Sequence, residues 1–473
     1  MTMTTDQHGN QITIASPDAL AGYDAMVDDL LHYRPAVVDT LAATLAADPS
    51  CAMAHAAQAH LGILGTEPDD VAAARVALDA YDQVVDLDAL TSRERMHLAA
   101  ARDLVRGDLY AGAATLREIV REHPRDALAL LVGHQVDFFT GDAVTLRDRV
   151  GGALSAWSPA DPHFGMLQGM YAFGLEETGQ YGRAEEVGLA SVEHDGTDVW
   201  GIHAVTHTFE MQGRFGEGLR YLDAHAAGWR HDNFLTVHNW WHYCLYLLEV
   251  GDADSVLEIY DSVLQHAESQ CVAMEMLDAA ALLWRLYLEG KDESARWTAL
   301  ADAWDAKMAE PYYAFNDMHA VMSYVGAGRI DDAVRLVDAR ERFAAQAVDD
   351  TVTNVAMTRG VGVPVGRALV AFGRGDYESA VQYLFPIRYV LHRFGGSHAQ
   401  RDAVQRTLVE AALRSGRLSL ARSLLSERLG VNPCSPYSWL KQAALAQALG
   451  DAAAEGAARS RATELRAEAR VAV

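Results

Sequence analysis

A glycine-centred turn recurs along this sequence, and its spacing limits the folds open to the chain. The segment ETGQYGRA at 177–184 aligns with MQGRFGEG at 211–218, and their turn glycines, Gly179 and Gly213, are 34 residues apart (213 − 179). A glycine in the left-handed conformation ends one helix, and the next helix begins within a few residues. A period of this length is typical of stacked pairs of helices.

Similar turns predict that the helix pairs continue towards the C-terminus. They occur at Gly251, Gly290, Gly328, Gly375 and Gly416. A small residue follows five positions after four of the turn glycines, where paired helices must approach closely: Ala184, Gly218, Ala333 and Ala380. Two intervals, 38 (251 − 213) and 39 (290 − 251), exceed 34 and indicate longer helices. We predict an all-α, tetratricopeptide-like helix-pair solenoid wound as an irregular right-handed superhelix.

Composition supports helix along the whole chain of 473 residues. Half of the residues are hydrophobic, and only 12 are proline. Ala and the straight-chain residues lose little entropy in a helix. We expect one continuous solenoid over residues 21–450, preceded by an N-terminal arm over 1–20 that either caps it or is partly disordered. An Ala/Arg/Glu-rich capping helix over 451–473 follows the solenoid.

The net charge of −26 argues against nucleic acid and membrane surfaces as partners, because such a surface repels phosphate. The four cysteines form no CxxC pair and are typical of reduced, mostly buried thiols: Cys51, Cys244, Cys271 and Cys434. No apolar run is close to the roughly 20 residues that a membrane-spanning helix needs. The first 21 residues are polar and lack the basic segment followed by an apolar segment that is typical of a signal peptide. We therefore expect a cytoplasmic protein.

Two histidine pairs stand in register. His203 and His207 share one helix face with Glu210, and His238 and His242 repeat the pair 35 residues later (238 − 203). Equivalent helices of successive repeats lie side by side, about 8–10 Å apart. The four histidines should therefore form a square on one surface. One repeat before His203 lies Gln168 (203 − 35), and one repeat before that lies His134 (168 − 34), so a row of polar side chains is expected along the groove.

Two later segments carry further polar groups. The first is FNDMH at 315–319, which opens a helix, and the second is GGSHAQRD at 395–402. In the second, a Gly-Gly turn meets a helix N-terminus that can hold an anion, although Ser397 can equally be an ordinary N-cap.

Each motif also has a structural interpretation. Imidazoles on a half-buried helix often bind one another or a backbone carbonyl, and Trp240 and Trp241 are most simply packing residues. Two pairs in register with Glu210 make a functional site about as plausible as a structural one. The sequence contains no GxSxG, P-loop or GxGxxG in a suitable context.

Two kinds of chemistry remain open for the cluster. A divalent metal would have enough ligand types in His203, His207, Glu210, His238 and His242. Without a metal, histidines beside Glu210 and Asp317 would shift one another's proton affinity and supply a general acid and base. Arg401 would then bind a carboxylate or oxyanion.

The sequence resembles the tetratricopeptide repeat protein 38 family over about residues 171–402. The resembling runs include IHAVTHTFEM at 202–211, HNWWH at 238–242, FNDMH at 315–319, FPIR at 385–388 and GGSHAQRD at 395–402. The resemblance implies a helical tetratricopeptide-like fold, a cytosolic location and no established activity. It marks these positions as recurring: His203, His207, Glu210, His238, His242, Asn316, Asp317, His319, His398, Gln400, Arg401 and Asp402.

Our leading hypothesis is a polar pocket on the concave face that binds a small polar or anionic molecule and acts on it by acid–base or metal-assisted chemistry, as a hydrolase or isomerase. The candidate catalytic residues are His203, His207, Glu210, His238, His242, Asp317, His319 and His398. The candidate substrate-binding residues are Trp241, Asn316, Gln400, Arg401 and Asp402. One alternative is a non-enzymatic scaffold that holds a peptide in the groove. Another is a homodimer formed through aromatics expected to be exposed, such as Trp229 and Tyr312.

Overall fold

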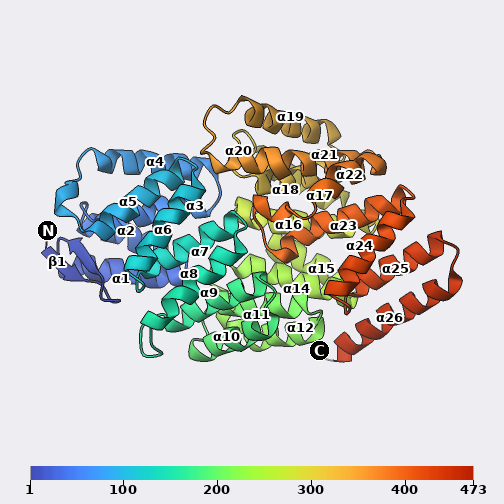
Figure 1. The fold of residues 1–473 in the computed structure, drawn as a ribbon, viewed down its shortest axis with the longest axis horizontal. Coiled ribbons are helices and arrows are strands. Elements are labelled where there is room, and N and C mark those ends of the chain that lie inside the picture. The colour runs from blue at the N-terminus through green and yellow to red at the C-terminus, as the bar shows by residue number, and fades with distance from the viewer. Residues whose placement is uncertain (1, 472–473) are drawn as a thin grey trace. The chain divides into compact units, whose positions relative to one another are not determined.

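The structure, a computed structural model, describes residues 2–471 and has an all-α, tetratricopeptide-like fold apart from one N-terminal hairpin. Figure 1 shows helix following helix along the chain. The contacts divide the chain into two compact units. Unit 1 comprises the chain up to Val205 with Ala227–Thr236 and Val348–Ala356, and unit 2 comprises Thr206–Ala226, Val237–Ala347 and the chain from Met357 onward.

A β-hairpin occupies most of the predicted N-terminal arm, residues 1–20, which was expected to be either a cap or partly disordered. β1 (Thr2–Thr5) pairs antiparallel with β2 (Gln11–Ile14). The carboxylate of Asp6 accepts hydrogen bonds from the backbone N–H groups of His8 (3.0 Å) and Asn10 (2.9 Å), which closes the turn. Ser16 then caps α1, which has a proline in its first turn.

Unit 1 consists of the hairpin and the N-terminal helix pairs. Its helices are α1 (Pro17–Leu31), α2 (Val37–Ala47), α3 (Ala52–Leu64), α4 (Pro68–Asp82), η1 (Leu87–Ala89), α5 (Ser92–Val105), α6 (Leu109–Glu122), α7 (Ala127–Phe139), α8 (Ala143–Ala153), η2 (Leu154–Ala156), α9 (Phe164–Glu177) and α10 (Tyr181–His194). Three more contribute at its edges: α11 (Val199–Met211), which continues into unit 2, α13 (Ala226–Trp229) and α20 (Thr353–Met357).

Unit 2 contains the remaining helices. They are α12 (Phe215–Ala224), α14 (Thr236–Val250), α15 (Ala253–Ile259), η3 (Tyr260–Leu264), α16 (Ala273–Leu288), α17 (Ser294–Asp305), α18 (Ala314–Gly326), α19 (Ile330–Gln346), η4 (Thr358–Gly362), α21 (Val363–Gly373), α22 (Tyr377–Leu384), η5 (Phe385–Ile387), η6 (Leu391–Phe394), α23 (His398–Arg414), α24 (Leu418–Val431), α25 (Pro436–Ala448) and α26 (Ala452–Val471).

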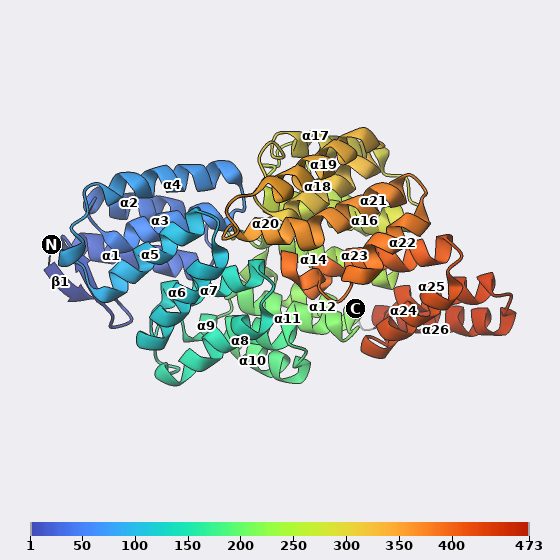
Figure 2. The same cartoon turned by 45° about the horizontal axis from the view of Figure 1, so that its top comes forward.

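Helix pairs are plain in both ribbon views. Figures 1 and 2 show α25 and α26 side by side as one pair near the C-terminus. Figure 2 also shows α18, α19 and α21 packed together. The π-helical turns η3 and η4 interrupt this regularity in unit 2.

The predicted glycine turns are confirmed. All seven have positive φ, from 72° at Gly213 to 84° at Gly251. Of the small residues five positions later, Ala184, Ala333 and Ala380 are fully buried, and a Cβ at Gly218 would collide with the ring of Tyr246. The same conformation at Gly107, Gly141 and Gly450 marks further turns that were not predicted from the sequence.

The observed burial of Trp229 and of two cysteines differs from the sequence-based predictions. Trp229 has no exposed surface, so the prediction that it is an exposed aromatic is wrong, while Tyr312 is half-buried. Cys51 and Cys244 are buried, whereas Cys271 and Cys434 are only half-buried.

One helical stretch is apolar enough to cross a membrane by length and composition, which was not expected from the sequence. It runs over Thr353–Gly373 with a mean hydropathy of 1.2, and 67% of its apolar window is buried inside the protein. A core helix passes the same test, so this stretch is weak evidence for a membrane span.

Gly169 on α9 marks a close approach of two helices within unit 1. A Cβ at this position would lie 2.9 Å from the backbone Cα and N of Gly201 on α11, and backbone cannot move aside cheaply. Gly169→Ala is therefore expected to lower the free energy of unfolding by about 1–3 kcal/mol, measured by urea denaturation.

Gly456→Ala provides the matched control for that substitution. Gly456 lies inside α26, and no atom comes within 4 Å of the point that its Cβ would occupy, so alanine there should stabilise by about 0.5–1 kcal/mol. Equal effects at the two positions would contradict the close approach.

Candidate functional site

Three histidine rings gather in unit 2, supplied by the end of α11 and by α14. The ring centroids of His207 and His242 are 4.3 Å apart, and those of His238 and His242 are 4.8 Å apart. Each of the three offers a ring nitrogen within 4.8 Å of the others. The spacing of one repeat therefore places three of the four histidines of the predicted square together.

Each histidine of the α14 pair contacts a carboxylate through Nδ1. His242 Nδ1 lies 2.8 Å from Glu210 Oε2 on α11, and His238 Nδ1 lies 2.8 Å from Asp278 Oδ2 on α16. His242 and Asp278 are fully buried, and the side chains of His238 and Glu210 are 16% and 11% exposed. Such carboxylates select the ring tautomer and fix the orientation of the ring.

Burial and neighbouring charges shift the proton affinities of this cluster. Burial raises the pKa of Glu210 to about 8, against the opposing influence of Arg285. Burial lowers the pKa of His207 well below its ordinary value, and His242 and His238 lower it further. At neutral pH, His207 is neutral and Glu210 is largely protonated or shares a proton with His242.

Helix α16 contributes two charged residues that sequence reasoning missed, Asp278 and Arg285. Arg285 is buried, and its guanidinium donates to the backbone oxygens of Ala281 (2.8 Å) and Ala399 (2.7 Å). Burial lowers the pKa of Arg285 to about 10. Among residues 2–471 it forms no ion pair, and its Nε has no hydrogen-bond partner. A lone Asp and a lone Arg, seven residues apart in an otherwise apolar helical run, were the available signal.

The two later motifs reach the same region of unit 2. His398 and Arg401 of α23 both lower the pKa of His207, after burial and the two other histidines. His319 of α18 is fully buried, and its Nδ1 lies 2.8 Å from the backbone oxygen of Phe315. Burial and the charge of Arg285 lower the pKa of His319 to about 3, against the opposing hydrogen bond to Phe315.

Other predicted site residues have structural partners. Asp317 forms an ion pair with Arg340 at 2.8 Å. Gln400 completes a capping box with Ser397 at the start of α23, so the ordinary N-cap describes this turn. Asp402 pairs with Arg406 at 2.5 Å and Arg428 at 2.6 Å.

Packing dominates the surroundings of the remaining candidates. Trp241 is fully buried and stacks on His238 with ring centroids 5.3 Å apart, and Asn316 is buried on α18. His203 lies in unit 1, where its ring contacts Trp200 at 4.8 Å and Phe173 at 5.3 Å. The predicted polar row is therefore embedded in aromatic side chains at this end.

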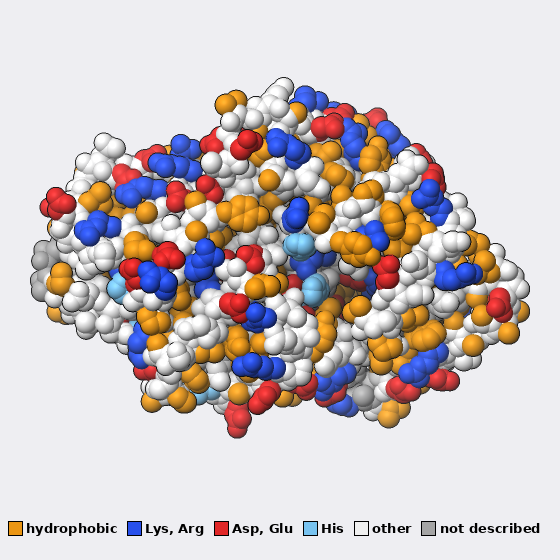
Figure 3. Space-filling view, viewed as in Figure 1, with side chains coloured by type: hydrophobic (Ala, Val, Ile, Leu, Met, Phe, Trp, Pro, Cys, Tyr) orange, Lys and Arg blue, Asp and Glu red, His pale blue; other side chains and the backbone are white. Residues whose placement is uncertain are grey.

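The surface of the molecule carries interspersed charges of both signs. Figure 3 shows acidic and basic side chains mixed across one face, with histidine side chains at the surface of a hollow near α14 and α16. His238 and His398 are both half-buried, which agrees with a site that solvent reaches at its edge.

No family model matches the chain. Solved structures with a similar course include the human IFIT1 dimer with PPP-AAAA, at 11% identity over 96% of each chain and a TM-score of 0.42. The APC/C hetero-tetramer Cut9–Hcn1 matches at 10% identity over 81% of this chain and 97% of that chain, with a TM-score of 0.24. The P58(IPK) TPR domain matches at 11% identity over 81% and 98%, with a TM-score of 0.22.

The fold and the helix-pair turns define the chain as a tetratricopeptide-type helical repeat protein. Within unit 2, this scaffold surrounds a buried cluster of histidines, each of two held by a carboxylate.

Proposed function

We propose that the cluster in unit 2 binds a small anionic molecule and acts on it by histidine–carboxylate acid–base chemistry, as a hydrolase or isomerase. The observation that carries this proposal is the pair of buried carboxylate–histidine contacts, His238–Asp278 and His242–Glu210. A histidine whose Nδ1 is held by a carboxylate can accept or donate a proton at Nε2.

The buried guanidinium of Arg285 favours an anionic ligand. A buried guanidinium is costly unless an opposite charge compensates it. Among the residues that the structure describes, this one contacts backbone oxygens and the face of Trp241, 5.4 Å away, but forms no ion pair. The carboxyl groups of Asp402, Glu210 and Glu249 act on it only from beyond contact, and burial still lowers its pKa. A carboxylate or phosphate of the ligand would supply the missing charge in bidentate geometry. Arg401 and His398, near His207, add positive potential to the same region.

A thermal-shift screen tests this proposal. The probes are small mono- and dicarboxylates and phosphate monoesters, each also followed for chemical conversion. A ligand at 100 times its Kd stabilises the folded state by about 2.7 kcal/mol, which a melting curve detects easily. Arg285→Gln should weaken binding at least tenfold, and His242→Gln should abolish conversion with a smaller effect on binding.

The control for these variants is His60→Gln in unit 1, another fully buried histidine. It should leave binding and conversion unchanged. Binding that survives Arg285→Gln and conversion that survives His242→Gln would reject the proposed site.

A non-enzymatic interaction scaffold is the second candidate. It is supported by the tetratricopeptide-type fold and by exposed aromatics around η5: Tyr383 is 40%, Phe385 36% and Tyr389 68% exposed. The guanidinium of Arg388 lies 3.9 Å from the rings of both Phe385 and Tyr389. A peptide partner held there would be lost in Tyr389→Ser and retained in Arg285→Gln.

We further propose membership of the tetratricopeptide repeat protein 38 family, supported by the motif runs at 202–211, 238–242 and 395–402. A cytoplasmic location is proposed on the four cysteines, which are all free thiols.

A further inference from the structure

Two buried carboxylates in unit 2 have a histidine as their only side-chain partner among residues 2–471. Asp278 is fully buried, its Oδ2 contacts His238 Nδ1, and its Oδ1 has no hydrogen-bond partner in the described part of the chain. Glu210 contacts His242 Nδ1 in the same way. A buried carboxylate without a cationic partner is costly, so Asp278 favours positive charge on the far side of the His238 ring.

The rings that these carboxylates hold converge with a third. His207, His238 and His242 each present a nitrogen within 4.8 Å of the others. Zinc binds imidazole nitrogens at about 2.0–2.1 Å, which brings tetrahedral ligands to about 3.4 Å from one another. The rings would close by roughly 1 Å, and a metal would replace the contacts that they make among themselves.

We infer that His207, His238 and His242 form a binding site for a divalent transition metal of the zinc class, with Asp278 and Glu210 orienting two of the ligands. Three imidazoles suit this class of metal, and carboxylates on Nδ1 raise the basicity of the coordinating nitrogen. Glu210 is thereby a positioning residue. This inference rests on the proposed function, because it names a cofactor for the same cluster.

A second cluster, in unit 1, is a weaker candidate and provides a control. Asp28, His32 and His163 also bring ligand atoms within 4.8 Å. There, however, Asp28 is 40% exposed and pairs with Arg34 at 2.6 Å, which repels a cation. His163 is already held between Asp28 (2.8 Å) and His8 (3.0 Å).

The experiment measures zinc stoichiometry and affinity in the full chain, purified without a polyhistidine tag and reloaded with Zn²⁺ after chelation. We expect about one tightly bound zinc per chain, lost in His238→Ala and His242→Ala. Asp278→Asn should weaken zinc binding about 10–100-fold without removing a ligand. Co²⁺ substitution should give the visible absorption of a tetrahedral site in the wild type only.

Two control variants separate the outcomes. His60→Ala removes a buried imidazole elsewhere and should retain the metal, so zinc loss there would show that the readout reports misfolding. Zinc that is lost in His163→Ala and retained in His238→Ala and His242→Ala would overturn the inference, as would no zinc in the wild type. If zinc is absent while the anionic ligand still binds through Arg285, the inference fails and the proposed function stands. If zinc binds but no anionic ligand does, the metal site stands and the proposed function fails.

Discussion

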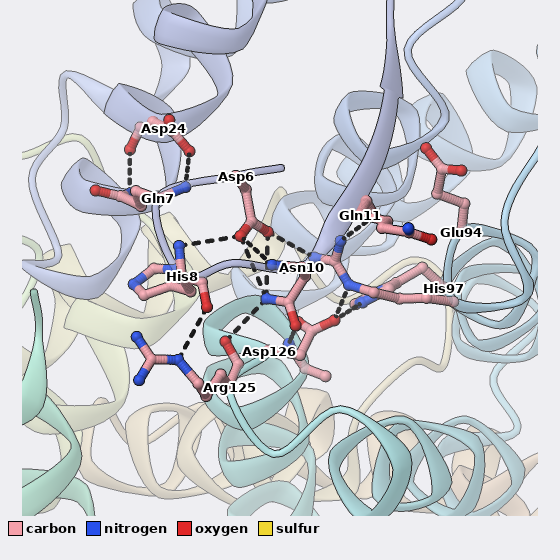
Figure 4. A network of polar contacts seen from close by, with 12 residues as sticks. Asp6, Gln7, His8, Asn10, Gln11, Asp24, Glu94, His97, Arg125 and Asp126 are labelled. Atoms are coloured by element: carbon pink, nitrogen blue, oxygen red, sulfur yellow. Dashed lines mark hydrogen bonds and ion pairs between the residues drawn. The ribbon is translucent and has the colours of Figure 1, made fainter. Parts of the chain in front are cut away.

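Replacing Arg93 with methionine is expected to lower the free energy of unfolding by about 3–5 kcal/mol in urea denaturation. Arg93 is buried on α5, with Nε 2.5 Å from Asp126 and Nη2 3.1 Å from Asp6. Asp126 also caps α7 and contacts His97 at 2.8 Å. Figure 4 shows Asp6, His97 and Asp126 in one network that ties the hairpin to two helices. Methionine fills the space and leaves the carboxylates without their cation.

The loss should depend on pH with a definite sign. Burial opposes the charge of Asp126, but Arg93 and His97 hold its pKa well below the usual range. A carboxyl with a depressed pKa contributes stability above its unfolded pKa of about 3.9 and loses that stability as the pH falls. The difference between wild type and Arg93→Met should therefore be full above about pH 5 and shrink towards about pH 3.

Arg121→Met is the control for the buried pair. The Arg121 side chain is 65% exposed and pairs with Glu118 on the surface of α6. Exposed ion pairs are screened by solvent and contribute little to stability, so this variant should differ little from wild type. A cost as small for Arg93→Met, or one independent of pH, would refute the assigned role of the network.

Arg406→Met should destabilise unit 2 by a similar amount, about 3–5 kcal/mol in urea denaturation. The Arg406 guanidinium joins Asp402 (2.5 Å) on its own helix to Glu249 (2.7 Å) on α14, and lies 4.0 Å from the ring of Tyr437. Glu249 also accepts from the backbone N–H of Tyr437 on α25 at 3.0 Å. Without Arg406, Glu249 is a buried carboxylate that has lost its cation.

A double variant distinguishes this electrostatic role from simple packing. Glu249→Gln removes the charge that Arg406→Met leaves uncompensated, so the double variant should be more stable than the sum of the two single losses by about 0.5–3 kcal/mol. Arg459→Met on α26, whose partner Glu455 lies in an exposed i,i+4 pair, should change stability by about 0–1 kcal/mol. Strict additivity of the first two variants would contradict a shared ion-pair network.

The helix pairs were predictable because backbone geometry requires particular residues. The residue that ends a helix in the left-handed conformation is usually glycine, so Gly179 and Gly213 reveal the turns in the sequence. The hairpin at Thr2–Ile14 was not predictable in this way, because its turn is closed by Asp6 and its sheet is held by Arg93 and Glu94, residues distant in sequence.

The candidate site was predictable where it follows the repeat. His207 and His242 are one period apart and meet, since equivalent positions of neighbouring repeats face each other. Asp317 and Asp402 had equally suggestive side chains, but their partners, Arg340 and Arg428, lie on the following helices and no local pattern reveals them. Arg285 was not singled out because an Asp and an Arg seven residues apart in a largely apolar helix match no known motif.

The interleaving of the two units has a consequence for synthesis on the ribosome. Unit 1 includes the segment Val348–Ala356. In this segment, Thr353 Oγ1 accepts a hydrogen bond from the backbone N–H of Leu109 (2.9 Å), and the backbone N–H of Thr353 donates to the backbone oxygen of Gly107 (2.9 Å). At about 5–20 residues per second, this closing segment emerges roughly 7–30 seconds after Val205. During synthesis, unit 1 therefore stays incomplete until Val348–Ala356 has been made, after residues 237–347 of unit 2. For the same reason, no truncation at a single position in the chain yields either unit complete.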